Sequence, residues 1–134
     1  MYSFETTKRV LYGETDKMGY VYYGNYPLFY EKGRVECMRS LGVSYKGLED
    51  SGIMMPVLDM NIKYIKPVKY DDLVRIKTTI LEVPGVRIKF KYELFLDDVL
   101  VNLGTTTLVF VSIAKQKPVN CPANLLTAIE KSFF

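Results

Sequence analysis

The chain changes character over residues 12–26, which read Tyr-Gly-Glu-Thr-Asp-Lys-Met-Gly-Tyr-Val-Tyr-Tyr-Gly-Asn-Tyr. A strand-like run ends at Tyr12, a polar turn that carries Glu14 and Asp16 follows, and an aromatic cluster leads into a helix. The first N–H groups of a helix have no acceptor within it, and they form the positive end of its dipole. A carboxylate just ahead of a helix start therefore combines a base with oxyanion donors, and this combination predicts chemistry here.

A helix is predicted over residues 26–41, with Asn25 as its N-cap, Pro27 in its first turn and Gly42 as its stop signal. Residues that recur every four positions predict one buried stripe, which comprises Phe29, Gly33, Cys37 and Leu41. A glycine inside a helix costs ~1 kcal/mol relative to alanine. The glycine in this stripe therefore predicts a close approach of backbone or ligand.

Five strands are predicted around this helix, because apolar and polar residues alternate between turn signals. They are expected over residues 4–12, 58–64, 74–80, 86–94 and 100–114, with a bend near Gly104 in the last. Shorter helices are expected over residues 44–51 and 125–134. Short turns between the later strands imply antiparallel neighbours. The sequence thus predicts one α+β domain, residues 1–134, in which one long helix covers a five-stranded antiparallel sheet.

The chain contains no histidine. Ser-His-Asp and Cys-His pairs are therefore excluded within it, and the commonest zinc ligand is missing, so we expect no metal. Acid–base chemistry near neutral pH falls to Asp, Glu, Tyr, Lys or water. Cys37 and Cys121 have no metal-type spacing and no export signal precedes them, which predicts free thiols in the cytoplasm. Cys37 lies on the predicted buried stripe, so we interpret it as a structural thiol.

The net charge of +3 and the pI of 8.8 are mildly basic. This charge does not match a strong nucleic-acid binder, and it suits either a small anionic ligand or solubility alone. No apolar run approaches the ~20 residues that a membrane helix needs, so no membrane span is expected.

The quoted segment resembles the hotdog-fold acyl-CoA thioesterases, and more narrowly their 4-hydroxybenzoyl-CoA thioesterase branch. The matching positions are Glu14, Asp16, Gly19, Val21, Tyr22, Tyr23, Asn25 and Tyr26. The branch's helix pattern Glu-x-x-Arg-x-Glu is filled by Glu31, Arg34 and Glu36, and its Lys-Pro-x-x-x-Asp-Asp-Leu run by residues 66–73. The resemblance covers nearly the whole chain and implies a hotdog fold, in which the sheet wraps around the long helix.

The resemblance also implies a site. The family's catalytic aspartate falls on Asp16, and backbone N–H groups around Tyr22 and Tyr23 would polarise the thioester carbonyl. Coenzyme A would enter as part of the substrate, with no separate cofactor, and the site would lie at the interface of a homodimer or homotetramer. Glu14 stands where Asp is commoner. Tyr23 stands where many relatives carry histidine, which we interpret as a hint about substrate preference.

Two questions about the carboxylates stay open at this point. Asp16 would either deprotonate a water or attack the carbonyl carbon itself. Glu31 is the alternative catalytic carboxylate, because another hotdog branch places its acid on the central helix. Otherwise Glu31 is an exposed helix residue that pairs with Arg34, and Glu14 is a supporting residue.

The predicted substrate-binding residues are Tyr22, Asn25, Tyr26, Arg87 and Lys89. The tyrosines, with Tyr23, would line an acyl pocket or pack in the core. For Asn25 we favour the role of a helix cap over a direct contact with the substrate. The basic pair shares one face of a strand with Lys91, and these cations would meet the phosphates of coenzyme A or form a solvated face.

Three functions follow from this interpretation. The first is a cytoplasmic acyl-CoA thioesterase, which we favour. The second is an acyl-carrier-protein thioesterase, in which basic residues dock an acidic carrier. The third is a non-catalytic acyl-CoA binding module, since one fold hosts several functions. The sequence predicts neither the acyl group nor the choice between dimer and tetramer.

Overall fold

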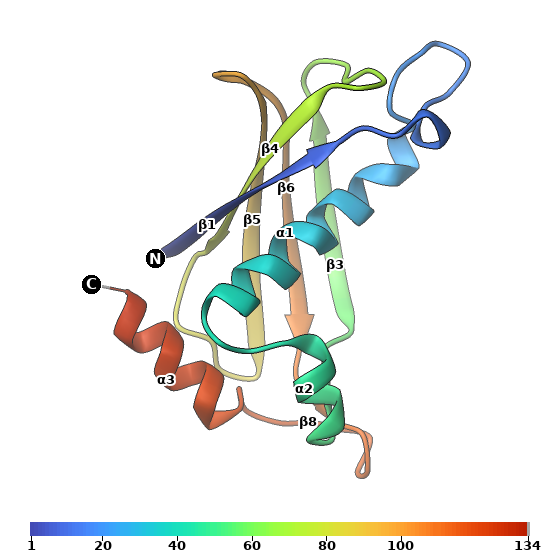
Figure 1. The fold of residues 1–134 in the computed structure, drawn as a ribbon. Helices are drawn as coiled ribbons and strands as arrows, with labels where there is room; N and C mark the ends of the chain where they lie inside the picture. The colour runs from blue at the N-terminus through green and yellow to red at the C-terminus, as the bar shows by residue number, and fades with distance from the viewer. Residues whose placement is uncertain (134) are drawn as a thin grey trace.

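The structure, a computed structural model, describes residues 1–133. A five-stranded antiparallel sheet with the strand order β1-β4-β5-β6-β3 lies against the helix α1 (Tyr26–Ser40) (Figure 1). The strands are β1 (Tyr2–Arg9), β3 (Val57–Tyr64), β4 (Leu73–Ile80), β5 (Arg87–Leu96) and β6 (Val99–Val109). The predicted arrangement, one long helix against a five-stranded antiparallel sheet, is confirmed.

The core lies between α1 and the sheet. Alternate side chains of β4 and β5 point to the helix and are fully buried, as the predicted alternation requires: Val74, Ile76, Thr78, Ile80, Phe90, Tyr92 and Leu94. Phe29 and Cys37 of the predicted helix stripe are also fully buried. A Cβ at Gly33 would overlap the Thr78 side chain and lie 2.8 Å from Ile76 Cγ2. The predicted close approach at this glycine is therefore to β4.

Gly104, where we expected a bend in the strand, makes room for an aromatic ring. The Tyr30 ring of α1 would overlap a Cβ at position 104, and β6 continues through this residue. Tyr30 stacks on Tyr92 with ring centroids 4.4 Å apart and donates a hydrogen bond to Asn102. The glycine thus fixes how closely α1 packs on the middle of the sheet.

The first predicted strand was placed too late in the chain. β1 covers Tyr2–Arg9, and Tyr12, the last residue of the predicted strand, already belongs to a short 3-10 turn, η1 (Tyr12–Glu14). The last predicted strand was too long, since β6 ends at Val109. The Phe110 N–H donates to the Val86 carbonyl at 3.0 Å, and the chain then crosses into a second sheet.

The second sheet has three short antiparallel strands in the order β2-β7-β8. They are β2 (Ile53–Met54), β7 (Val111–Ser112) and β8 (Lys117–Pro118). Both short helices were predicted, and they are α2 (Tyr45–Asp50) and α3 (Ala123–Ser132). The predicted end of the last helix, Phe134, lies outside the described residues. Within residues 1–133, no helix combines the length and apolar character needed to cross a membrane.

Candidate active site

Glu14 ties the end of β1 to the start of α1. Its carboxylate accepts a hydrogen bond from the Leu11 N–H at 2.7 Å and lies 3.2 Å from Lys8 Nζ. Its main-chain carbonyl accepts from the Tyr22 N–H and from Asn25 Nδ2, both at 2.9 Å. Glu14 is therefore a supporting residue that joins two elements, and its carboxylate is already occupied.

Asn25 does not cap the helix, so that prediction was wrong. It lies at the N-cap position of α1, but its backbone is already helical, with φ −90° and ψ −13°, and its side chain makes no capping hydrogen bond. The reason is a 3-10 turn, η2 (Tyr23–Asn25), which runs directly into α1. The freed amide group instead donates to the Glu14 carbonyl and holds the helix start against the loop.

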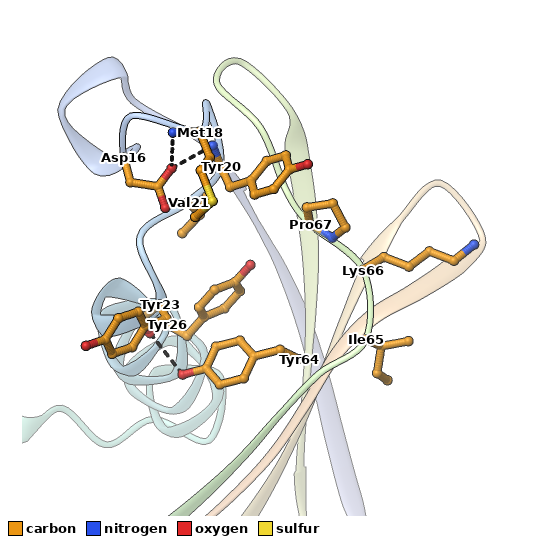
Figure 2. Close-up of a pocket in the computed structure, with 10 residues that line it drawn as sticks. All are labelled: Asp16, Met18, Tyr20, Val21, Tyr23, Tyr26, Tyr64, Ile65, Lys66 and Pro67. Atoms are coloured by element: carbon orange, nitrogen blue, oxygen red, sulfur yellow. Dashed lines mark hydrogen bonds between the residues drawn. The ribbon is translucent and has the colours of Figure 1, made fainter.

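Asp16 is half-buried in a tight turn. Its Oδ1 accepts hydrogen bonds from the Met18 N–H at 2.9 Å and from the Tyr20 N–H at 3.2 Å (Figure 2). Gly19, with φ +79°, lets the chain turn back for this, since that conformation suits glycine. Oδ1 is thus fixed, whereas Oδ2 accepts no hydrogen bond from the residues that the structure describes.

A first cavity of about 270 Å³ opens beside Asp16. Figure 2 shows its walls, which come from the loop before α1, the start of α1 and the segment that leaves β3. The lining residues are Asp16, Met18, Tyr20, Val21, Tyr23, Tyr26, Tyr64, Ile65, Lys66 and Pro67. The cavity is therefore mostly apolar and aromatic, with Asp16 at its edge, and the Lys66 side chain extends away from the tyrosines (Figure 2).

Tyr23, at the helix start, lines this cavity, and its N–H donates to no main-chain acceptor among the described residues. Tyr23 is the first residue of η2, whose first hydrogen bond runs from the Asn25 N–H to the Tyr22 carbonyl at 2.9 Å. The Tyr23 N–H precedes that bond and has no helical acceptor. The Tyr22 N–H, by contrast, is taken up by Glu14. Of the two donors predicted here, only Tyr23 is therefore available.

The predicted tyrosines take different positions. Tyr26 is 3% exposed and serves both as core and as cavity wall, with its ring edge-on to Tyr64 at 5.3 Å. Burial, with smaller effects of Tyr64 and Asp16, raises the pKa of Tyr26 to about 12. The Tyr23 side chain is largely exposed, and its carbonyl accepts from the Tyr64 hydroxyl at 3.1 Å. Tyr22 packs on Tyr23 with centroids 4.6 Å apart, outside the first cavity.

A second cavity of about 790 Å³ also borders Asp16. Its lining residues are Tyr12, Thr15, Asp16, Lys17, Gly19 and Tyr70. Asp16 is thus a common wall of two cavities of different character, the first mostly apolar and the second more polar.

Arg87 and Lys89 are not brought to Asp16 within one chain. Arg87 pairs with Val109 at one end of the sheet, whereas Tyr64, which lines the first cavity, pairs with Asn102 at the other end. Both basic side chains are exposed on β5. Their predicted contact with coenzyme A therefore requires another subunit.

Glu31 lies on the exposed side of α1 and lines neither of the two cavities. Its expected pairing with Arg34 is absent among the described residues. Arg34 is buried and donates to the Tyr45 hydroxyl at 2.9 Å. Of these two carboxylates, only Asp16 lines either cavity.

Sequence reasoning missed several cavity residues. Lys66 was noticed only as part of the Lys-Pro motif, although its position next to a strand end was a usable signal. Tyr64 was interpreted only as a strand residue, and Tyr12 and Tyr70 were given no role. Nothing in the periodicity shows that loops 58 residues apart meet at one site, as Tyr12 and Tyr70 do.

Both cysteines are free and buried. Burial raises the pKa of the Cys37 thiol and of the Cys121 thiol to about 12, so both stay protonated near neutral pH. Neither thiol is therefore an activated nucleophile. No group of three His, Cys, Asp or Glu side chains in residues 1–133 is placed to hold a metal ion.

Sequence comparison identifies relatives of this chain. The family model described as "Thioesterase superfamily" matches residues 18–103, a stretch that begins just after Asp16. The acyl-CoA thioesterase YbgC of Haemophilus influenzae is 32% identical over 126 residues, which cover 93% of each chain. A relative from Bacillus subtilis is 37% identical over 86 residues, and this match covers 64% of the present chain and only 62% of that relative.

Solved structures agree with this relationship. A DHNA-CoA thioesterase from Staphylococcus aureus superposes with a TM-score of 0.92 at 33% identity, over 98% of this chain and 91% of that one. A 4-hydroxybenzoyl CoA thioesterase superposes with a TM-score of 0.84 over 96% of this chain and 99% of that one. Its identity is 19%, so it supports the fold alone.

Proposed function

From the premise that this chain belongs to the thioesterase superfamily and is an acyl-CoA thioester hydrolase, we propose that Asp16 is its catalytic carboxylate. We assign the oxyanion donor to the Tyr23 N–H. The observation that carries this proposal is that both residues, one from the loop and one from the helix start, line the same cavity. Because Oδ1 of Asp16 is held by two main-chain N–H groups, Oδ2 is the oxygen left to react.

The chemistry follows from these two groups. Either Asp16 takes a proton from a water that attacks the thioester carbon, or Oδ2 attacks that carbon and water then cleaves the mixed anhydride. In both routes the carbonyl oxygen becomes an oxyanion that the Tyr23 N–H stabilises, and such a donor contributes roughly 3 kcal/mol in other enzymes. The C–S bond then breaks, and the thiolate leaves as coenzyme A once it is protonated. The other product is the free acid.

We assign the acyl group to the first cavity. Tyr23, Tyr26 and Tyr64 give it aromatic walls, and Val21 and Ile65 add apolar surface. Asn25 and Tyr22 do not line this cavity. Asn25 therefore acts by positioning the helix start, and Tyr22 supports the ring of Tyr23.

We propose that the active protein is a homodimer that pairs through β3. This strand forms one edge of the sheet, and exposed apolar side chains lie at both of its ends: Val57, Leu58, Tyr64 and Ile65. An exposed apolar edge strand favours pairing with another chain. A second copy on this edge would cover the first cavity. Arg87 and Lys89 would contact coenzyme A only where another subunit brings them to it.

The test is a panel of short, long and aromatic acyl-CoA thioesters, with release of the free thiol as the readout. Wild-type protein should hydrolyse at least one of them, and Asp16→Asn should lose this activity while circular dichroism shows an intact fold. No hydrolysis across the panel would contradict the proposal. Matched thioesters on coenzyme A and on a carrier protein test the substrate further, and we expect the former to be hydrolysed faster.

We place this activity in the cytoplasm. Support comes from the two free, buried thiols, which suit a reducing compartment. Fractionation of cells that express a tagged full-length chain would test this placement.

A further inference from the structure

One tyrosine of the edge strand β3 contacts the start of α1. Tyr64 is the last residue of β3, and its hydroxyl donates to the Tyr23 carbonyl at 3.1 Å (Figure 2). The ring of Tyr64 lies edge-on to Tyr26, with the ring centroids 5.3 Å apart. All three tyrosines line the first cavity. Tyr64 is therefore a wall of this cavity that is also hydrogen-bonded to the turn η2.

The start of α1 is held without a side-chain cap. Neither η2 nor α1 has a capping hydrogen bond from the side chain at its N-cap position. On the side of the loop, the Glu14 carbonyl accepts from the Tyr22 N–H and from Asn25 Nδ2. On the side of the sheet, the hydroxyl of Tyr64 binds Tyr23, which lies between those two donors in the chain. The turn η2 is thus held from two sides, and the Tyr64 hydroxyl provides the hydrogen bond on the side of the sheet.

The cross-strand partner of Tyr64 also binds α1. Tyr64 pairs with Asn102 of β6, and the fully buried Asn102 accepts a hydrogen bond from the Tyr30 hydroxyl. Tyr30 lies one turn after Tyr26 on α1. The Tyr30 bond lies in the core, whereas the Tyr64 bond is exposed and lies at the cavity. A typical hydrogen bond contributes only modestly to stability, so loss of the exposed one should leave the fold intact.

Resting on the proposed function, we propose that Tyr64 is a positioning residue for the hydrolysis. Its hydroxyl holds Tyr23 in place, and with it the main-chain N–H that we assign to the oxyanion. The N–H and the carbonyl of one residue are separated by only two rotatable backbone bonds, so fixing the carbonyl restricts the direction of the N–H. A displacement of about 1 Å can lower a rate by about 10²-fold. Tyr64 therefore acts on the rate through Tyr23, without contacting the reacting atoms.

The test removes the hydroxyl and keeps the ring. With an acyl-CoA thioester that the wild type hydrolyses, Tyr64→Phe should lower kcat about tenfold, with KM within about twofold. The unfolding temperature should stay near that of the wild type. Tyr64→Leu also removes the aromatic wall and should raise KM as well. Sedimentation should give one assembly state for all variants at the assay concentration, because Tyr64 lies on the strand through which we expect the dimer to pair.

Tyr2→Phe is the matched control. The Tyr2 hydroxyl also joins a strand to α1, since it lies 2.6 Å from Ser40 Oγ in an exposed hydrogen bond. Tyr2 belongs to β1, and Ser40 is the last residue of α1, so this bond lies at the opposite end of the helix from η2. Both kcat and KM should stay at the wild-type values in this variant.

An NMR readout reports on the hydrogen bond itself. The Gly24 N–H shares a peptide group with the Tyr23 carbonyl, and a hydrogen bond to that carbonyl polarises the whole group. The Gly24 signal in the ¹H–¹⁵N spectrum should therefore shift in Tyr64→Phe and stay in place in Tyr2→Phe. A Gly24 signal that stays in place in Tyr64→Phe would contradict the inference.

Three kinetic results would overturn the inference. An unchanged kcat in Tyr64→Phe would show that this bond does not affect the rate, and a raised KM with normal kcat would make the hydroxyl a substrate contact. An equal fall of kcat in Tyr2→Phe would show that any loosening of α1 slows the reaction. Full hydrolytic activity of Asp16→Asn would instead contradict the proposed function, so the two failures are distinguishable.

Discussion

The loop that carries Asp16 and the paired strands β4 and β5 are held together in different ways. In the strands, alternate side chains are fully buried under α1, and packing fixes their positions. In the loop, most side chains are exposed, and hydrogen bonds to the main chain through Glu14, Asp16 and Asn25 fix its path. We therefore expect the packed sheet to provide most of the free energy of folding, and the loop to position the groups proposed to react. Substitutions in the two regions should therefore have separable effects.

The largest expected effect is on the rate, from the loop. Asp16→Asn should lower kcat by roughly 10²–10⁴-fold, because it removes the base or nucleophile. The amide oxygen of asparagine can still accept from the Met18 and Tyr20 N–H groups, so thermal unfolding should shift little. Asp16→Ala loses these hydrogen bonds too and should lower both kcat and the unfolding temperature. Equal unfolding temperatures for the two variants would contradict the role given to Oδ1.

The next effect is on stability, from the sheet. Gly104→Ala places a Cβ inside the Tyr30 ring position and should lower the free energy of unfolding by about 2–3 kcal/mol. The kcat per folded molecule should remain near wild type. Gly13→Ala in the loop is the matched control, because a Cβ there meets nothing within 4 Å. Urea denaturation measures both, and a Gly104→Ala protein as stable as Gly13→Ala would refute the packing argument.

Tyr26 is both a buried core residue and a wall of the first cavity. The pKa of its hydroxyl therefore reports whether this wall is shielded from solvent. Its folded pKa of about 12 lies above the ordinary value of 10.0, so the folded state holds the proton more tightly. This contribution is fully present below pH 10 and is lost as the pH rises from 10 to 12, and it amounts to roughly 2 kcal/mol. Tyr26→Phe should flatten the fall in unfolding free energy over that range. An unchanged slope in urea titrations at several pH values would show that Tyr26 is solvated.

The smallest expected effect comes from Asn25, the link between the loop and the helix start. Asn25→Asp keeps the shape but replaces the donor to the Glu14 carbonyl with an acceptor. We expect kcat to fall about tenfold with KM unchanged, because the Tyr23 N–H moves relative to Asp16. Asn120→Asp, in the exposed loop before α3, controls for the added charge. A raised KM with normal kcat would instead make Asn25 a substrate contact.

Much of the regular fold was predictable from the sequence. The alternation in residues 74–80 and 86–94 predicted which side chains of β4 and β5 are buried, since one face of these strands packs on the helix. The strand ends were less predictable. Phe110 continues the apolar run of β6 and its N–H still bonds the Val86 carbonyl, whereas Val111 already belongs to β7 of the second sheet, so the apolar pattern does not mark this boundary.

The site was predictable in part. Asp16 and Tyr23 were chosen from the motif, and the structure places them at one cavity. The roles of Asn25 and the Tyr22 N–H were mispredicted, because a 3-10 turn before α1 redirects both to Glu14. Arg87 was chosen for its charge alone, and periodicity cannot show which end of the sheet a residue shares with a loop. Such long-range placements depend on the strand register.

The central claim is that Asp16 and the Tyr23 N–H meet at the same thioester carbonyl. The most direct test is the ¹H–¹⁵N spectrum of the Asp16→Asn protein, titrated with an acyl-CoA analogue in which CH₂ replaces the sulfur. We predict that the Tyr23 amide proton shifts downfield more than any other amide of residues 12–26, because it alone donates to the bound carbonyl. A Tyr23 amide that stays in place while the signals of Val21 and Tyr26 move would contradict the account.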